Sequence, residues 1–436
     1  MDKPIINGVA GLIFIACITY LGYIPGQDDF YQIIVPYTIL FGSYLYLLRE
    51  CKSFRFLLTL AIVARFILIF TVPNLSDDIY RFIWDGRAIH AGLIPYGSLP
   101  SDLVGTVSGL GTELFDLLNS PEYYSLYPPI SQIFNYCSTL VSSESYIAEA
   151  IIYKSMLFAC DLLLMRFLYR IVQAIQVDWS RMFLYLLNPL IIIEINGNVH
   201  FEGVMILFLA ASLYYLFNNR HLRSGAALGA SVASKMLTMM YSVAMFFYTP
   251  AKQRIPLVIG AVITGMILFL PLAISLNQDG ANVLASLDLY VKKFEFNGSL
   301  YYLLRGIGYE IYGYNTIHIW GPQLSIATLL AILYISYKTR EKDYYHLLNT
   351  IFWCTIIFLV TSRTVHPWYL SLAIFSSVFT RFRFPILWSY LIFFTYINYS
   401  YLEYHENLFI VFIEYGLVLA YGLYEWKLKK PQVALT

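Results

Sequence analysis

Acidic and basic side chains are closely spaced in one short stretch that directly follows an apolar segment. Asp77 and Asp78 are adjacent, Arg81 follows three residues after Asp78, and Asp85 lies four residues beyond Arg81. Residues three or four apart share one face of a helix, and Ser76 is a favoured helix-capping residue, so the spacing predicts a helix that begins here with its charges on one face. A carboxylate in such a position can accept a proton from a hydroxyl group. The alternative is a charged amphipathic helix that lies on the lipid headgroups without a catalytic role.

Four further ionisable residues occur at the ends of apolar segments or within them. His200 and His366 each lie between two apolar segments, Arg363 lies three residues before His366, and Lys235 interrupts an apolar stretch. Ionisable groups are costly inside a membrane and commonly face a cavity or one another, so these residues are candidates for a polar site. For both histidines, a position at the membrane interface without a functional role explains the sequence about equally well.

Other polar and sulfur-containing residues are predicted to be structural. Lys154 and Asp161 are seven residues apart, which places them on one face of a helix and favours a pair that holds the helix in place. The cysteines have neither the paired spacing of a zinc site nor the density of a disulfide framework, and we expect them to be packing residues. They are Cys17, Cys51, Cys137, Cys160 and Cys354.

The composition identifies a protein that spans a membrane several times. Hydrophobic residues make up 59% of the 436 residues and charged residues only 13%, which is too little polar surface to cover a soluble protein of this size. The formal net charge is +1, and no basic patch with interleaved aromatic residues occurs. Nucleic acid is therefore excluded as a partner. We treat residues 1–436 as a single integral membrane domain.

The apolar segments are long enough for about twelve crossings of a bilayer. They lie near 6–24, 30–48, 54–73, 146–168, 181–195, 200–217, 254–276, 316–337, 346–362, 367–380, 385–402 and 407–425.

The basic residues predict the orientation of these crossings. Most of the 28 lysines and arginines fall in alternate connections, which is the positive-inside pattern with both termini in the cytoplasm. Residues 223–249 lie between two basic connections on the same side and are too short for two full crossings, so we expect a re-entrant helical hairpin with Lys235 near its tip. The alternative is one long span, with the topology misjudged elsewhere.

Two connections on the opposite, exoplasmic side are too long to be simple links. They cover residues 74–145 and 277–315, and long loops of this kind commonly carry function. The first contains the acidic stretch, and its prolines Pro128 and Pro129 predict the start of a helix. We expect both connections to be structured.

Several short motifs run from Ser76 to Tyr369. They are Asp-Asp-x-x-Arg-x-x-Trp-Asp-Gly-Arg at 77–87, Gly-x-x-Pro-Tyr at 92–96, Tyr-Pro-Pro at 127–129, Asn-Pro at 188–189, Gly-Asn-x-His at 197–200 and His-Pro-Trp-Tyr at 366–369. Together they resemble the GT-C superfamily of integral membrane glycosyltransferases, and within it the bacterial polyprenyl-phosphate-mannose-dependent mannosyltransferases. The first motif is fairly specific, whereas each later one is weak alone. Two departures are Phe201-Glu202 after the histidine and Ile94 where the family pattern has asparagine.

The resemblance implies an all-α polytopic enzyme of the cell membrane with its active site on the exoplasmic side. Such an enzyme moves a hexose, by family default mannose, from a polyprenyl-phosphate-sugar donor to a hydroxyl of a lipid- or glycan-linked acceptor, with inversion. Asp77 is the expected general base and Asp78 the second candidate. Phosphate is already a good leaving group, so no strong general acid and no cofactor is required. A divalent metal is left open, because adjacent carboxylates can bind one.

The remaining motif residues are expected to bind the phosphate or to orient the acidic pair. Cations that stabilise the charge on the leaving phosphate are required by this chemistry, and arginine suits the purpose through its paired donors. The candidates are Lys235, Arg363 and Arg87 as cations, His366 and His200 as further contacts, and Arg81 and Asp85 as a network beside the acids.

A transporter or flippase of a lipid-linked or small polar substrate is the alternative function. Many spans, intramembrane charges and a re-entrant hairpin occur in transporters too. However, the sequence shows no internal repeat of the kind that such transporters carry, and a noncatalytic scaffold would leave the acidic pair unexplained.

Overall fold

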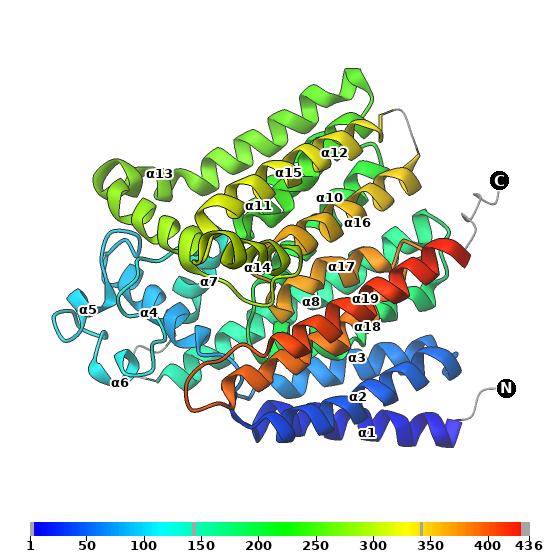
Figure 1. The fold of residues 1–436 in the computed structure, drawn as a ribbon, viewed down its shortest axis with the longest axis horizontal. Coiled ribbons are helices and arrows are strands. Elements are labelled where there is room, and N and C mark those ends of the chain that lie inside the picture. The colour runs from blue at the N-terminus through cyan, green and yellow to red at the C-terminus, as the bar shows by residue number, and fades with distance from the viewer. Residues whose placement is uncertain (1–3, 142–144, 341–342, 429–436) are drawn as a thin grey trace.

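The computed structural model describes residues 4–141, 145–340 and 343–428, with side chains at all of these positions except 275–293 and 428. Every regular element in these ranges is helical, and the one strand-like contact there is an isolated bridge between Phe296 and Thr364. This confirms the prediction of an all-α protein. The helices run side by side along the long axis of the molecule (Figure 1).

The N-terminal part of the bundle consists of three helices, and a group of short helices follows it at one end. The first three are α1 (Pro4–Tyr23), α2 (Phe30–Glu50) and α3 (Phe54–Leu68). We refer to the next four helices and their connections as the cap: α4 (Asp78–His90), α5 (Pro100–Leu103), α6 (Thr112–Phe115) and α7 (Pro129–Ser138). The start of α7 directly after Pro128 confirms the predicted proline start.

The middle of the chain alternates long helices with broken ones. Its elements are α8 (Tyr146–Ala174), η1 (Trp179–Met182), α9 (Phe183–Leu186), the π-helix η2 (Ile191–Gly197), α10 (Glu202–Phe217), α11 (His221–Ser234), η3 (Met236–Tyr241), α12 (Ser242–Tyr248), η4 (Ala251–Gln253) and α13 (Arg254–Lys293).

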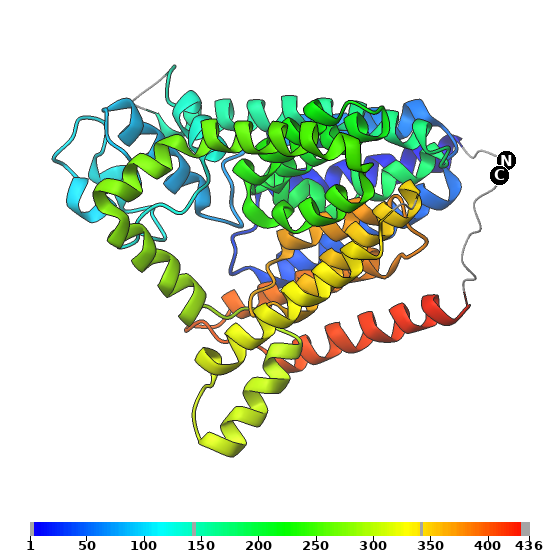
Figure 2. The same ribbon diagram turned by 90° about the horizontal axis from the view of Figure 1, so that it is seen from above.

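The C-terminal part contributes long helices and several short ones. Its elements are α14 (Leu300–Tyr312), α15 (Ile317–Tyr337), α16 (Tyr344–Thr361), η5 (Pro367–Leu370), α17 (Ser371–Ser377), α18 (Phe384–Leu391), η6 (Ile392–Tyr399) and α19 (Leu408–Leu428). The expected connection 277–315 is thus largely helical, formed by the end of α13 and by α14. Figure 2 shows α13 bending away from the bundle toward this second group of helices.

Six of the described helices are long and apolar enough to cross a membrane, and a seventh span arises if the bent pair η2 and α10 counts as one. This supports a polytopic membrane protein, and the number of twelve spans stays a prediction. The difference has local causes. The predicted span 54–73 contains only the 15 residues of α3, and the segments 367–380 and 385–402 are divided into short helices.

The segment 223–249 folds back on itself at Lys235. α11 ends at Ser234, Lys235 is extended, and η3 and α12 follow. The rings of Phe217, at the end of α10, and Tyr248, at the end of α12, are 6.4 Å apart, so α11 and α12 meet the same end of the bundle. Lys235 therefore lies at the inner turn of a helical hairpin, as expected, and its re-entrant position in a membrane stays a prediction.

Small residues allow two close helix crossings that fix this architecture. A Cβ atom on Gly225 of α11 would lie 1.9 Å from the Leu257 carbonyl oxygen of α13, and one on Gly86 of α4 would lie 2.2 Å from the Asn135 carbonyl oxygen of α7. Only glycine permits backbones to approach so closely. The first crossing holds α11, with Lys235 at its end, against α13, and the second holds α4 inside the cap.

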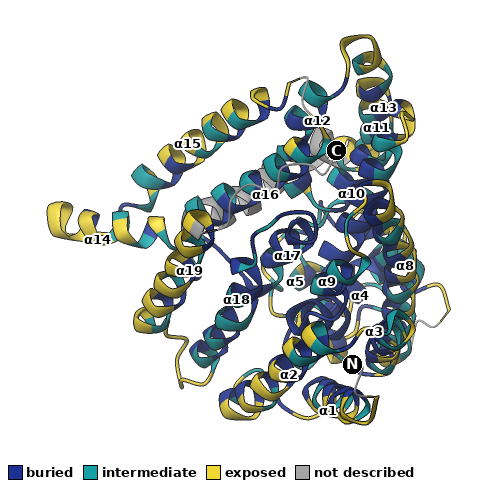
Figure 3. Ribbon diagram, turned by 90° about the vertical axis from the view of Figure 1, so that its right-hand side faces the viewer, coloured by how far each residue is buried: buried dark blue, intermediate teal, exposed yellow. Residues whose placement is uncertain are grey.

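The core has two parts. Figure 3 shows that the buried residues lie on the inner faces of the helices. The larger cluster fills the bundle, and a smaller one lies beneath the cap, where Phe82 and Trp84 of α4 pack with Tyr153 and Leu157 of α8. The cap is therefore anchored on α8, so the position of α4 relative to the bundle is fixed by buried apolar contacts.

Candidate active site

The acidic pair lies at the N-terminus of α4, one residue later than the sequence predicted for the helix cap. Asp77 occupies the capping position, and the Ser76 hydroxyl accepts a hydrogen bond from the Asp78 N–H at 3.4 Å. The carboxylates at this end face the positive end of the helix dipole. The helix therefore presents both acids at its start and directs the later charges of the motif into the cap.

Asp77 is the less constrained of the two acids. Its side chain is exposed and has no hydrogen-bond or ion-pair partner within the part of the chain that the structure describes. The protein around its carboxylate and, to a smaller extent, the neighbouring Asp78 raise the pKa of Asp77 above its ordinary value. A raised pKa makes a carboxylate a stronger base, and the absence of a partner leaves it free to accept a proton.

Asp78 is held by two contacts from distant segments. Its Oδ1 accepts a hydrogen bond from the Asn119 amide at 3.2 Å, and its Oδ2 lies 3.7 Å from His200 Nδ1. The other ring nitrogen of His200 lies 3.3 Å from the Oε2 of Glu194, a fully buried carboxylate that also accepts a hydrogen bond from the Tyr396 hydroxyl. His200 thus lies between one acid that reaches the surface and another that does not.

The backbone before His200 has an uncommon conformation. The π-helix η2 ends at Gly197, and the buried, β-branched Val199 has a φ of 58°. That region is strongly disfavoured for such a residue, and both π-helices and strained residues concentrate at functional sites. The strained turn brings the His200 ring between Asp78 and Glu194.

A stack of rings joins His200 to the segment at 366–369. The rings of His200 and Trp368 are 3.6 Å apart and nearly parallel, and those of Trp368 and His366 are 4.4 Å apart. His366 also stacks on Phe296 at 4.6 Å. Burial, together with His200 and Lys235, lowers the pKa of His366 to about 3, so its ring is neutral. We refer to His200, His366 and Trp368 as the ring stack.

Lys235 approaches this stack from the turn of the α11–α12 hairpin. Its ammonium group pairs with the buried Glu202, the first residue of α10, and lies 5.2 Å from the ring centre of Tyr369. The side chain keeps 28% of its surface exposed. Lys235 is therefore the one predicted cation that is both partly accessible and adjacent to the ring stack.

Arg81 and Asp85 form a network inside the cap instead of orienting the acidic pair. Arg81 Nε lies 2.8 Å from Asp85 Oδ1, and its Nη1 donates to the carbonyl oxygens of Ser120 and Tyr123 at 2.9 Å. Asp85 also accepts hydrogen bonds from the side chains of Ser125 and Gln132. Both charges are almost completely buried, so these contacts stabilise the cap, and a role in substrate binding stays a prediction.

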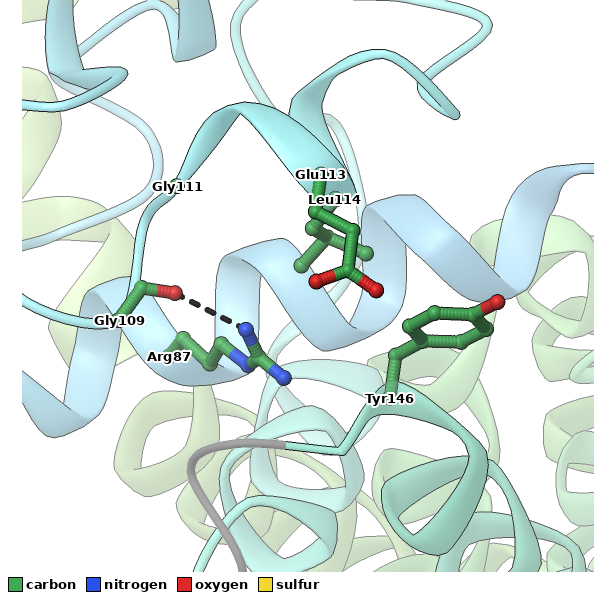
Figure 4. Close-up of a pocket in the computed structure, with 6 residues that line it drawn as sticks. All are labelled: Arg87, Gly109, Gly111, Glu113, Leu114 and Tyr146. Carbon is green, nitrogen blue, oxygen red and sulfur yellow. Dashed lines mark hydrogen bonds between the residues drawn. The ribbon is translucent and has the colours of Figure 1, made fainter.

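Arg87 is likewise engaged by a carboxylate. Its Nε and Nη2 donate to Glu149 of α8, at 3.1 and 2.7 Å, and its Nη1 donates to the Gly109 carbonyl oxygen at 3.0 Å. Figure 4 shows this guanidinium in a shallow pocket of about 220 Å³ between α4 and the loop before α6, beside Tyr146. Arg87 therefore joins the cap to α8, and its predicted role in phosphate binding stays a prediction.

Arg363 lies away from the acids, against α15. A Cβ atom on Gly321 would come within 2.7 Å of Arg363 Nη1, and the Arg363 carbonyl oxygen accepts a hydrogen bond from Phe296 at 3.2 Å. Its guanidinium has no hydrogen-bond or ion-pair partner within the described ranges. No contact joins it to the ring stack directly, so its predicted role in phosphate binding stays a prediction.

The predicted pair of Lys154 and Asp161 is wrong in its partners. Asp161 Oδ2 lies 2.9 Å from Arg65 Nε, and Lys154 donates to the Thr71 carbonyl oxygen at 2.9 Å. Asn196 donates to the same Asp161 oxygen at 2.7 Å. Both residues are nevertheless structural, since they fix α8 against α3 and η2.

Sequence reasoning did not include Glu194, Glu202 and Trp368 among the site residues. Glu194 lies six residues before His200 and Trp368 two residues after His366, and both could have been found from their closeness to the histidines. No group of three or more His, Cys, Asp or Glu side chains suited to a metal ion occurs in the described parts of the chain. The question of a metal stays open.

The acidic start of α4 contacts the ring stack through Asp78 and His200, and Lys235 lies against Tyr369, which follows Trp368 of the stack. The chain belongs to the MptA_B family: the model of the alpha-(1->6)-mannopyranosyltransferase N-terminal domain matches residues 30–250. A comparison with curated proteins gives no match.

The family match confirms the resemblance to membrane mannosyltransferases that the motifs indicated. The matched range contains Asp77, Asp78, His200 and Lys235 and ends before Arg363. The protein is therefore a multi-pass membrane protein of a mannosyltransferase family, which favours an enzyme over a transporter and implies a sugar donor and an acceptor.

Proposed function

We propose that the protein is a GT-C-type inverting mannosyltransferase that uses a polyprenyl-phosphate-mannose donor and a lipid- or glycan-linked acceptor hydroxyl. The observation that carries this proposal is the pair of an unpartnered carboxylate, Asp77, and a partly accessible ammonium group, Lys235, joined through Asp78 and the ring stack. A base and a cation on either side of a donor are what displacement of a phosphate from a sugar requires.

Asp77 acts as the general base in this proposal. It accepts the proton of the acceptor hydroxyl while the hydroxyl oxygen attacks the anomeric carbon from the face opposite the phosphate. The bond between the anomeric carbon and the phosphate oxygen breaks, and the polyprenyl phosphate leaves with the electron pair. The sugar is inverted, and the proton remains on Asp77 until water removes it. Asp78, held by Asn119 and His200, keeps a second negative charge beside the base.

Lys235 stabilises the charge that develops on the leaving phosphate. Its ammonium group has three N–H donors, of which Glu202 engages one or more, and the side chain retains exposed surface for a further contact. His366 is a neutral ring with a buried Nδ1 that has no hydrogen-bond partner among the described residues, and it can donate one N–H to the same phosphate. The mechanism requires no general acid, and the question of a metal stays open.

The location of the site follows from the ends of the bundle. α1 begins and α19 ends at one end of the molecule, and the cap with Asp77 lies at the other (Figure 1). With both termini in the cytoplasm, as the positive-inside pattern predicts, the site faces the exoplasmic side of the cytoplasmic membrane. The polyprenyl tail of the donor then stays in the bilayer while its sugar phosphate reaches the ring stack.

Replacement of Asp77 by asparagine tests the base. Asparagine keeps the size of the side chain but cannot accept the proton, so transfer from radiolabelled polyprenyl-phosphate-mannose should fall by roughly 10²- to 10⁴-fold, with donor binding retained. Asp102→Asn is the matched control, because Asp102 is an exposed acid of the cap far from α4 in sequence. Wild-type transfer by Asp77→Asn together with loss of transfer by Asp78→Asn would assign the base to Asp78 instead.

A further inference from the structure

A groove crosses the outer face of α10 between α8 and α11. These three helices lie at one flank of the bundle (Figure 3). Its volume is about 430 Å³. α10 packs against both neighbouring helices and forms the floor. Leu163 and Phe167 of α8 form one wall, and Ala226 and Ala227 of α11 form the other. The groove is hollow because its α11 wall consists of alanines, whose side chains do not fill the space between the helices.

The groove lies at the depth of the membrane. α10 is the long part of the bent pair that has the length and composition of a span. α11 packs along α13, and the 24 residues Ala251–Ile274, which comprise η4 and the first part of α13, are a candidate span. Leu163 at the groove and Leu222 beside it are 51% and 53% exposed. Apolar side chains left open at this depth contact lipid, so a hydrocarbon chain is the natural occupant of an apolar groove here.

One end of the groove is strongly basic. Arg223 lines it, and Arg220 precedes α11 in the adjoining turn. The Phe167 ring of α8 lies 6.1 Å from the Tyr215 ring near the end of α10. Arg170 lies one helical turn beyond Phe167 on α8, so it is also near the end of α10, as Arg220 is. These arginines are exposed, and none has an ion-pair partner within the part of the chain that the structure describes.

The three helices that form the groove carry no acid near these charges. No aspartate or glutamate occurs between Glu202 and Asp279, and on α8 none follows Asp161. A guanidinium at the end of a membrane-depth groove lacks a protein counter-ion and matches a phosphate in charge and geometry. The groove therefore suits a ligand that combines an apolar chain with an anionic group.

We propose that this groove binds an anionic phospholipid, with one acyl chain between α8 and α11 and the phosphate on Arg223. The lipid belongs to the leaflet at the far end of α10 from His200. α10 has 16 residues and is about 24 Å long, so the lipid site is separate from the candidate active site. The proposal therefore does not depend on the mannosyltransferase mechanism.

Native mass spectrometry of the purified full-length protein, titrated with phosphatidylglycerol or phosphatidylcholine of the same acyl chains, tests this site. We expect one phosphatidylglycerol molecule to bind about tenfold more tightly than phosphatidylcholine, because the arginines attract net negative charge. Arg223→Gln should remove most of this preference. Ala227→Phe, which fills the groove, should weaken the binding of both lipids about tenfold.

Arg49→Gln is the matched control, since Arg49 is an exposed arginine at the end of α2 that does not line the groove. It should change phosphatidylglycerol binding less than twofold. Equal binding of the two lipids, equal losses in Arg49→Gln and Arg223→Gln, or full binding by Ala227→Phe would overturn the proposal. Ala226→Leu is the second groove-filling variant if Ala227→Phe does not fold, as judged by gel filtration and circular dichroism.

Discussion

Replacement of Asp85 by alanine should strongly destabilise the cap. The change leaves the Arg81 guanidinium, only 2% exposed, without its carboxylate partner. Breaking a buried ion pair by removing one partner costs about 3–5 kcal/mol, because the remaining charge is neither solvated nor paired. The side chains of Ser125 and Gln132 lose an acceptor as well, although they also hydrogen-bond to each other at 2.8 Å, which limits their share of the loss.

Removal of both charges should cost much less than the two single changes together. In an Arg81→Met, Asp85→Ala double variant no buried charge remains, and the main loss is that of the hydrogen bonds to two backbone carbonyls, about 1–3 kcal/mol. The free energy of unfolding of the four forms in mixed micelles, measured by titration with sodium dodecyl sulfate, gives this double-mutant cycle.

Asp102→Ala is the control for this cycle, because Asp102 is exposed and should change stability by less than about 0.5 kcal/mol. The reasoning is refuted if Asp85→Ala is no more destabilising than Asp102→Ala, or if the effects of the two single changes simply add. The network also holds Ser120 next to Asn119, the partner of Asp78, so Asp85→Ala should lower transfer as well as stability.

Three further changes test the base, the cation and the helix packing. In a pH–rate profile, the acid limb of kcat/KM should lie above the pKa of a free aspartate. Asp78→Asn should shift this limb to lower pH, because the Asp78 charge raises the pKa of Asp77. An unshifted limb in Asp78→Asn would contradict this coupling. Lys235→Met should reduce kcat by about 10²-fold or more and Lys235→Arg recover part of it, whereas equal rates in both variants would exclude a role for the charge. Gly86→Ala should cost about 1–3 kcal/mol in the unfolding assay, while Gly42→Ala, with open space around its Cβ, should be neutral or stabilising.

Contacts within one helix could be predicted from the sequence. The four-residue spacing of Arg81 and Asp85 predicted that they share one face of a helix, where they form an ion pair, and Pro128 and Pro129 predicted the start of α7. The serine and the two aspartates at 76–78 placed the start of α4 to within one residue. These features depend on local geometry, which the order of residue types largely determines.

Contacts between helices could not be predicted in this way. The spacing of Lys154 and Asp161 placed them on one face, but Asp161 is bound by Arg65, 96 residues earlier in the chain. Likewise, nothing in the sequence around Arg87 indicated its partner Glu149, 62 residues later. A helical pattern identifies the face on which a charge lies and not the segment that packs against it.

Hydropathy also could not predict where the helices are broken. The segments 181–195 and 367–380 are apolar enough to be read as spans, yet the first contains α9 and most of the π-helix η2, and the second contains η5 and α17. Breaks of this kind depend on tertiary packing. The breaks near 197 and 366 position His200 and His366. The irregular segments that hydropathy did not resolve therefore carry the residues of the ring stack.

A cryo-EM map of the protein in nanodiscs supplied with polyprenyl-phosphate-mannose tests the central claim most directly. The account predicts density for a mannosyl phosphate with the phosphate at Lys235 and the anomeric carbon facing Asp77, and with the ring stack along one side of the sugar. Density for the donor elsewhere, with Asp77 turned toward bulk water and Lys235 still bound only to Glu202, would contradict it.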